Sequence, residues 1–170
     1  LNRTDSGVDS EEKQEVLKRM FSQSQVAIVY GSAGVGKSTL INHVAHFFSE
    51  KNKLFLSQTN PAVDNLKRRV TAGNCTFSTI TRFLTKRDVR TDYDLLVIDE
   101  CSTVSNSDMK KVLEKASVQL ILLVGDTYQI NSIRFGNWFS VVRKFIPESA
   151  VYKLTNPYRS KNENLLTLWT

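Results

Sequence analysis

The sequence has few of the features that mark disulfide-rich, zinc-binding, membrane-spanning or disordered proteins. Its 170 residues include two cysteines, Cys75 and Cys101, far apart and outside any CxxC pair, which excludes a disulfide or zinc framework. No window approaches the roughly 18 apolar residues of a membrane span, and the first residues do not follow the basic-then-apolar order of a signal peptide. With 41% hydrophobic and 24% charged residues, the composition is globular, so disordered and collagen-like classes are excluded.

The length predicts one domain, because domains average about 100–200 residues. We expect a soluble, cytoplasmic protein with no membrane partner. The chain lacks an initiator methionine, and residues 161–170 resemble an interrupted helix. We therefore expect residues 1–170 to be a single domain excised from a longer protein.

Positive charge is concentrated in one segment. The chain carries a net charge of +6, and residues 65–91 alone hold seven basic residues and one acid. This segment is either a solvated face or an edge that binds a polyanion. Because Lys67, Arg68 and Arg69 are successive in a predicted helix, they cannot all face one ligand.

Short β-rich runs alternate with helical patterns along the chain. The apolar runs are near-continuous, which is typical of a parallel sheet covered on both faces. The predicted strands are 25–30, 53–57, 94–98, 118–124 and 150–154, and the predicted helices are 10–21, 37–49, 61–70, 78–85, 106–116 and 137–145. The fold class is therefore predicted to be α/β, a mostly parallel sheet with helices on both faces.

A phosphate-binding loop lies between the first strand and the second helix. Residues 31–38 read GSAGVGKS and fit G-x-x-x-x-G-K-[ST], whose backbone N–H groups surround phosphates beside a helix N-terminus. We expect Lys37 to bridge the β- and γ-phosphates of ATP and the Ser38 hydroxyl to coordinate Mg²⁺. The predicted nucleotide-binding set is Gly31, Ser32, Ala33, Gly34, Val35, Gly36, Lys37, Ser38 and Thr39.

Acidic residues follow two later strands. LLVIDE, residues 95–100, delivers Asp99 and Glu100 to the sheet edge where ligands bind in such folds. Asp99 is the candidate Mg²⁺ ligand through water, and Glu100 is the candidate base for an attacking water, unless the pair merely caps the next segment. GDTYQI, after the next strand, places Asp126 and Gln129 at the same edge. We expect Gln129 to sense the γ-phosphate.

Polar residues also follow the strand at 53–57. Thr59 and Asn60 precede Pro61, which suits the first turn of a helix. Their side chains are either phosphate ligands or a helix cap. Phe77 and Phe83 are either core residues or stacking partners for bases.

The motif order resembles the first RecA-like domain of superfamily 1 helicases, particularly the RecD-like branch. The segments that carry the resemblance are GSAGVGKS, LSQTNPAVDNL (56–66), FSTITRFL (77–84), VIDECS (97–102), VGDTYQI (124–130) and LTNPYRS (154–160). The resemblance covers about residues 8–169. Thr81 stands where many relatives carry a histidine, and INSIRFGNWF (130–139) replaces a proline-containing stretch.

The resemblance implies a RecA-like P-loop NTPase fold and an ATP-dependent motor. It implies that Gln14 contacts the adenine and that Arg159 reaches the γ-phosphate as an arginine finger supplied in cis. The nucleic-acid contacts that it implies are Thr59, Asn60, Asn65, Arg68, Ser78, Thr79 and Arg82.

The leading interpretation is an ATP-binding and hydrolysing helicase or translocase domain, with ATP and Mg²⁺ as cofactors. We expect single-stranded nucleic acid, DNA rather than RNA, and a second RecA-like domain of the same full-length chain as partners. Movement in the 5′ to 3′ direction is implied by the RecD-like resemblance. The isolated domain is expected to hydrolyse ATP weakly or not at all.

Two other classes share the phosphate-binding loop. One is a regulatory or loader ATPase that acts on a protein partner. The other is a nucleotide kinase, against which the order LVIDE, GDxxQ and YR argues, because it is an arrangement of hydrolases. A binding module without activity is disfavoured by the complete set of Lys37, Ser38, Asp99, Glu100, Gln129 and Arg159.

Overall fold

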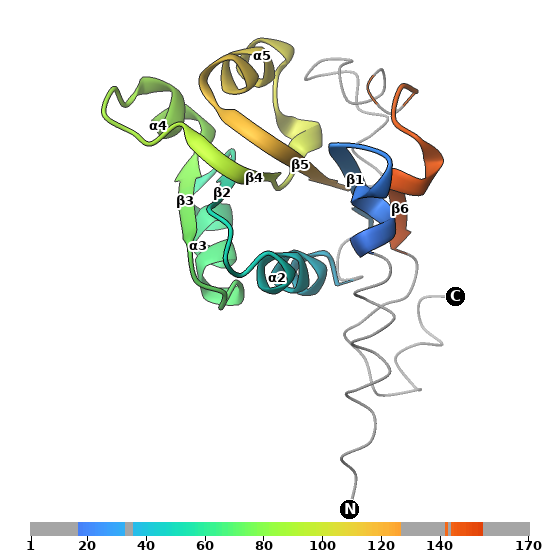
Figure 1. The fold of residues 1–170 in the computed structure, drawn as a ribbon. Helices are drawn as coiled ribbons and strands as arrows, with labels where there is room; N and C mark the ends of the chain where they lie inside the picture. The colour runs from blue at the N-terminus through green and yellow to red at the C-terminus, as the bar shows by residue number, and fades with distance from the viewer. Residues whose placement is uncertain (1–16, 33–35, 127–141, 143, 155–170) are drawn as a thin grey trace, which may run out of the picture.

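A six-stranded, entirely parallel sheet forms the centre of the protein (Figure 1). The computed structural model describes residues 17–32, 36–126, 142 and 144–154. The strand order is β3-β2-β4-β5-β1-β6. The strands are β1 (Val26–Gly31), β2 (Lys53–Ser57), β3 (Cys75–Thr79), β4 (Asp92–Ile98), β5 (Ser117–Gly125) and β6 (Val151–Leu154).

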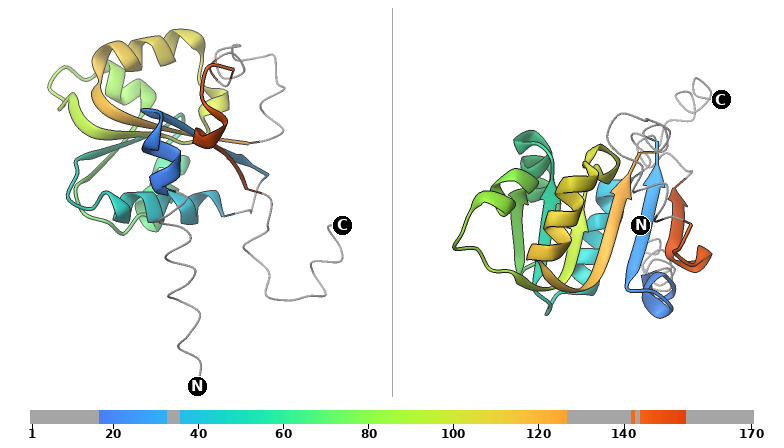
Figure 2. Two further views of the ribbon diagram at one scale, coloured as in Figure 1. Left: turned by 45° about the vertical axis from the view of Figure 1, so that its right-hand side comes forward. Right: turned by 90° about the horizontal axis from the view of Figure 1, so that it is seen from above.

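Helices cover both faces of this sheet. They are a helix at 17–22, α2 (Lys37–Phe47), α3 (Asn60–Arg69), α4 (Ile80–Thr85) and α5 (Asn106–Lys115), with short 3₁₀ turns at Cys101–Thr103 and Glu148–Ala150. Helices α2 and α3 lie against one face, whereas α4 and α5 lie against the other (Figures 1 and 2). The predicted α/β class, with a parallel sheet covered by helices on both faces, is confirmed.

Two hydrophobic cores result from the alternation of side chains along the strands. In β1, Ala27 and Val29 belong to the core beneath α2 and α3. Ile28 and Tyr30 belong to the core beneath α4 and α5. Successive strand residues point to opposite faces, so near-continuous apolar runs such as VAIVYG are needed to fill both layers.

Side-chain caps fix where three helices begin. Thr59, Thr79 and Ser105 accept hydrogen bonds from backbone N–H groups three residues ahead, at 3.3, 3.2 and 3.1 Å. Such caps satisfy N–H groups that the first helical turn leaves without partners. The cap function predicted as one alternative for Thr59 is therefore present.

The largest error in the predicted elements is a missed strand and the helix start that follows it. The helix expected at 78–85 begins only at Ile80, because residues 75–79 form the edge strand β3, which pairs with β2. Ser78 and Thr79 therefore end a strand instead of starting a helix. The expected helix at 10–21 is described from residue 17 onward, and the one at 137–145 lies mostly outside the described residues.

A buried lysine closes the end of α2. Lys53 is 0% exposed, and its ammonium donates to the carbonyls of Phe48, Ser49 and Lys51 at 2.7, 3.2 and 2.7 Å. Burial lowers the pKa of Lys53. The side chain thus satisfies carbonyls that the end of a helix leaves without intrahelical partners.

No helix in the described part of the chain has the length and apolar character that crossing a membrane requires.

Candidate nucleotide site and nucleic-acid groove

The phosphate-binding motif lies between the carboxyl end of β1 and the start of α2. Strand β1 ends at Gly31, and α2 begins at Lys37. Gly36 precedes the helix with φ 90° and ψ 19°, a left-handed conformation that favours glycine. The sequence pattern therefore occupies the strand-to-helix position in which such a loop binds phosphate.

The ammonium of Lys37 points back toward the end of β1. It donates to the carbonyls of Gly31 and Ser32 at 2.6 and 3.0 Å. Its Nζ also lies 3.6 Å from Oδ2 of Asp126, which follows β5. The sequence placed Asp126 at this edge through GD directly after an apolar strand but assigned it no role in the site.

Asp99 and Glu100 stand at the same edge, directly after β4. The backbone N–H of Asp99 donates to the carbonyl of Leu56 in the neighbouring strand β2 at 2.9 Å. The backbone N–H of Glu100 donates to Oδ1 of Asp99, also at 2.9 Å. Glu100 has φ 53° and ψ 35°, a left-handed conformation that is strained for a non-glycine residue.

The two acids have different environments. Burial raises the pKa of Asp99 to about 6, and the neighbouring charge of Glu100 adds to this rise, while the hydrogen bond from the Glu100 amide and the charge of Lys37 oppose it. Glu100 itself is exposed. A desolvated carboxylate favours a bound cation, whereas an exposed one is accessible to water.

The donor chemistry at this edge fits Mg²⁺. Asp99 and Ser38 supply the hard oxygen ligands that this ion prefers, and Mg²⁺ usually takes only one or two protein ligands together with substrate phosphates and water. Among the described residues there is no cluster of three His, Cys, Asp or Glu side chains able to hold a metal.

A polar groove opens beyond the carboxyl ends of β2 and β3. Its volume is about 690 Å³, and it is lined by Gln58, Thr59, Asn60, Thr79, Thr81, Arg82 and Thr85. Four of the seven predicted nucleic-acid contacts, namely Thr59, Asn60, Thr79 and Arg82, are thus brought together. Gln58, Thr81 and Thr85 also line this groove but were not predicted.

The other three predicted contacts lie elsewhere. Arg68 donates to Oδ1 of Asn65 at 2.8 Å on the exposed side of α3, and the Ser78 hydroxyl donates to the carbonyl of Thr79 at 3.0 Å. None of them lines the groove.

Both aromatic candidates make packing contacts. Phe83 is buried, and Phe77 stacks on Phe55 with ring centroids 5.0 Å apart. Both side chains therefore act in packing, the first of the two alternatives.

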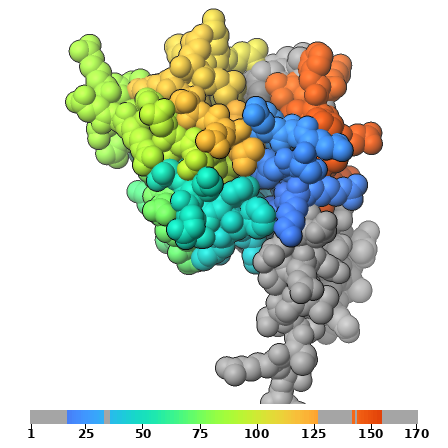
Figure 3. Space-filling view, viewed as in Figure 1, coloured from blue at the N-terminus to red at the C-terminus, as the bar shows by residue number. Residues whose placement is uncertain are grey.

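The basic segment does not form one surface. Lys67, Arg68 and Arg69 lie in the last turn of α3, which covers one face of the sheet, whereas Arg82 lies in α4 on the other (Figure 1). The loop after α4 projects from the body of the molecule (Figure 3). Of the seven basic residues, Arg82 alone is among the residues that line the groove.

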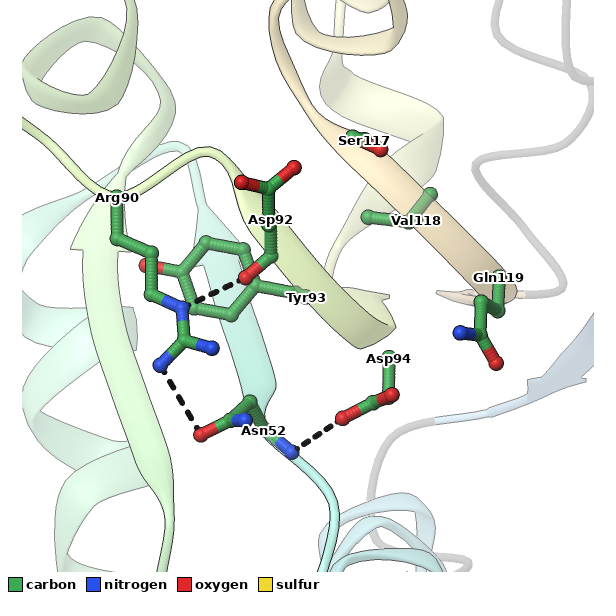
Figure 4. Close-up of a pocket in the computed structure, with 8 residues that line it drawn as sticks. All are labelled: Asn52, Arg90, Asp92, Tyr93, Asp94, Ser117, Val118 and Gln119. Carbon is green, nitrogen blue, oxygen red and sulfur yellow. Dashed lines mark hydrogen bonds between the residues drawn. The ribbon is translucent and has the colours of Figure 1, made fainter.

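Arg90 belongs to a separate pocket of about 310 Å³ at the amino ends of β4 and β5 (Figure 4). The phosphate-binding motif follows the carboxyl end of β1, at the other end of the parallel strands. Its guanidinium lies over the Tyr93 ring, 5.4 Å from the centroid. It donates to the Asp92 carbonyl at 2.7 Å and to Oδ1 of Asn52 at 3.1 Å. Asp94 accepts from the Asn52 backbone N–H at 2.8 Å. These interactions join the starts of neighbouring strands and are structural.

Several predicted site residues lie outside the described part of the chain: Gln14, Ala33, Gly34, Val35, Gln129 and Arg159. Gly31, Ser32, Gly36, Lys37, Ser38 and Thr39 are described and lie together from the end of β1 into the first turn of α2.

A comparison with protein families decides the membership of the chain. The model of the AAA domain family matches residues 9–169. The chain belongs to the AAA domain family. No curated protein matches this AAA domain significantly.

Solved structures share its fold. A Bacteroides Pif1 helicase in complex with ADP-AlF3 and ssDNA is 17% identical to this chain, with a TM-score of 0.58. The match covers 92% of this chain and 44% of the Pif1 chain. Pif1 helicase from Candida albicans is 20% identical, with a TM-score of 0.54 and coverages of 92% and 42%. The Sulfolobus solfataricus SWI2/SNF2 ATPase core in complex with dsDNA is 10% identical, with a TM-score of 0.61 and coverages of 85% and 43%. The AAA domain thus spans less than half the length of these chains, with which it shares the RecA-like fold.

Proposed function

We propose that this AAA domain is the ATP-binding and hydrolysing motor domain of a superfamily 1 helicase or translocase that moves on single-stranded DNA. The observation that carries the proposal is that the phosphate-binding loop and the polar groove open on one edge of one sheet. Strand β4, which delivers Asp99, is hydrogen-bonded to β2, which leads into Gln58, Thr59 and Asn60. Gln58 Nε2 also donates to the Thr103 carbonyl, just past Glu100, at 3.5 Å.

At the nucleotide, each charged group has a distinct role. Lys37 exchanges its contacts with the Gly31 and Ser32 carbonyls for contacts with phosphate oxygens. An ammonium bonds more strongly to a charged phosphate oxygen than to a neutral carbonyl oxygen. Ser38 directly and Asp99 through a water would hold Mg²⁺, which would neutralise charge on the phosphates. Glu100 orients a water in line with the γ-phosphate and accepts its proton. Gln129 and Arg159 are proposed to sense and stabilise the γ-phosphate.

In the groove, hydroxyl, amide and guanidinium groups bind the phosphate backbone. Such groups contact phosphate without reading sequence, which suits a motor that must move along any strand. The Bacteroides Pif1 structure contains ADP-AlF3 and ssDNA together, and the shared fold supports the same pairing of ligands here.

Motor action needs a second RecA-like domain, and this chain matches less than half of each helicase chain above. We therefore propose that a second such domain of the same full-length protein closes over the nucleotide. A domain tested without it is expected to bind ATP and to hydrolyse it slowly.

The test is a fluorescence-anisotropy titration of labelled single-stranded DNA, and in parallel RNA, at several salt concentrations. The logarithm of Kd should rise linearly with the logarithm of salt concentration, and Arg82→Ala should reduce the slope by about 0.7 for one lost phosphate contact. Lys111→Ala removes the same charge from the exposed face of α5 and should leave the slope unchanged. Absence of salt-dependent binding would refute the proposal and favour an ATPase that acts on a protein partner.

A further inference from the structure

A lysine on α5 is bonded to the end of α4. The ammonium of Lys115 donates to the carbonyls of Phe83, Leu84 and Lys86 at 2.7, 3.2 and 2.7 Å. It also lies 5.3 Å from the centroid of the Phe83 ring. The last carbonyls of a helix lack intrahelical partners and carry partial negative charge, so a cation placed among them stabilises the helix end.

This contact matters because α4 is only six residues long. Helices of that length do not persist by themselves in water. Two buried side chains, Ile80 and Phe83, hold α4 to the sheet. The Thr79 hydroxyl caps its first turn, and Lys115 fixes its last.

The same helix supplies one wall of the groove, from Thr81, Arg82 and Thr85. Lys115 is not among the residues that line the groove, and its three bonds are all to backbone carbonyls. An effect of Lys115 on a strand in the groove must therefore pass through the position of α4.

We propose that Lys115 is a positioning residue of the groove, which holds α4 so that Arg82 and its neighbours meet the nucleic-acid backbone. This inference rests on the proposed function, because it assigns to the groove the single-stranded partner proposed above. Lys115 binds neither the strand nor the nucleotide.

The experiment compares Lys115→Met with Lys111→Met in the full chain. Both substitutions remove one positive charge and keep an unbranched side chain, but Lys111 lies one turn earlier on the exposed face of α5. We expect Lys115→Met to raise the Kd for a labelled single-stranded oligonucleotide about tenfold and to leave the Kd for ATP unchanged. Lys111→Met should change neither, and Lys115→Arg, which keeps the charge and several donors, should restore most of the affinity.

A double-mutant cycle with Arg82→Ala separates positioning from other roles. If Lys115 acts through α4, its substitution should raise the Kd by less than about twofold once Arg82 is absent, because the effects of two residues that act through one element are not additive. Equal losses in the two backgrounds would overturn the proposal. So would an unchanged Kd for Lys115→Met.

Amide hydrogen exchange provides a readout without nucleic acid. Lys115→Met should speed exchange in residues 80–86 but not in the strands, since local opening reports local stability. Unchanged exchange at 80–86 would refute the positioning role. If the exchange result holds but the unsubstituted chain binds no oligonucleotide, the proposed function fails, and with it the assignment of a nucleic-acid role to Lys115.

Discussion

Replacing Glu100 by glycine should stabilise the protein while it abolishes hydrolysis. Glu100 has φ 53°, and a residue with a Cβ pays about 1–2 kcal/mol for that left-handed conformation. Glycine adopts this conformation without that cost. Its greater freedom in the unfolded chain, however, lowers the stability of the folded state by roughly 0.5–1 kcal/mol. The expected net gain in the free energy of unfolding is about 0.5–1 kcal/mol.

Little else changes at this position. The side chain of Glu100 is exposed, so no packing is lost. Glu100 makes hydrogen bonds through its backbone. Its carbonyl accepts from the Thr103 amide and hydroxyl at 2.9 and 2.8 Å. Its N–H donates to Oδ1 of Asp99. Glycine keeps all three. The perturbation is therefore confined to the backbone strain and the loss of one carboxylate.

Glu100→Gln is the matched control. It removes the negative charge beside Asp99, as Glu100→Gly does, but it retains the Cβ and the strain. Urea denaturation followed by circular dichroism should place Glu100→Gly about 0.5–1 kcal/mol above Glu100→Gln, a difference of roughly 1–4 °C in Tm for a chain of this size. In the full-length protein, both variants should lose ATPase activity. If Glu100→Gly is as stable as Glu100→Gln or less stable, the strain argument is wrong, and if Glu100→Gln keeps its activity, the assignment of the base is wrong.

Three further outcomes are expected. Lys53→Met should lower the free energy of unfolding by about 2–4 kcal/mol in urea denaturation, because three carbonyls lose a charged donor; a loss below about 0.5 kcal/mol would contradict this. The raised pKa of Asp99, about 6 against 3.8, means that the ligand-free folded state binds more protons than the unfolded state between these values, so stability falls as pH rises from about 4 to about 6. Asp99→Asn should remove that slope and gain up to about 3 kcal/mol at pH 8, measured as denaturation midpoints across pH. Cys101, 0% exposed, should resist iodoacetamide in the native protein until denaturant is added, whereas Cys75, only partly buried, should be alkylated first; mass spectrometry of the labelled peptides distinguishes the two.

The central strands and the acids that follow them were predictable from the sequence because burial on both faces leaves a direct signature. A run such as LLVI in β4 has no polar position, and all four of its residues are buried. The phosphate-binding loop is similarly local, since its glycines and lysine are contiguous.

The edge strand β3 was not predictable in this way. CTFST contains one large apolar residue, and its strand conformation depends on pairing with β2. Because that partner lies about twenty residues earlier in the sequence, no local pattern reports it, and the helix was expected to begin too early.

The roles of Lys53 and Lys115 were hidden for a related reason. A lysine in a strand or in the last turn of a helix has the same sequence signature whether its ammonium is solvated or bonded to carbonyls. For Lys115 those carbonyls lie about thirty residues away in the chain. Asp126, by contrast, follows a local signal, GD directly after an apolar strand, and its side chain lies 3.6 Å from the Lys37 ammonium.

The parallel sheet fixes the separation between the end of β1, where the phosphate-binding motif begins, and the groove. The sheet between these two places consists of hydrogen-bonded neighbours in the order β1, β5, β4, β2 and β3. Adjacent strands in such a sheet are about 4.8 Å apart. The two places cannot move apart by the length of a nucleotide unless the hydrogen bonds between strands break. If the domain moves along a nucleic-acid strand, the movement must therefore arise between this rigid domain and a second one. The sheet itself keeps its shape during the step.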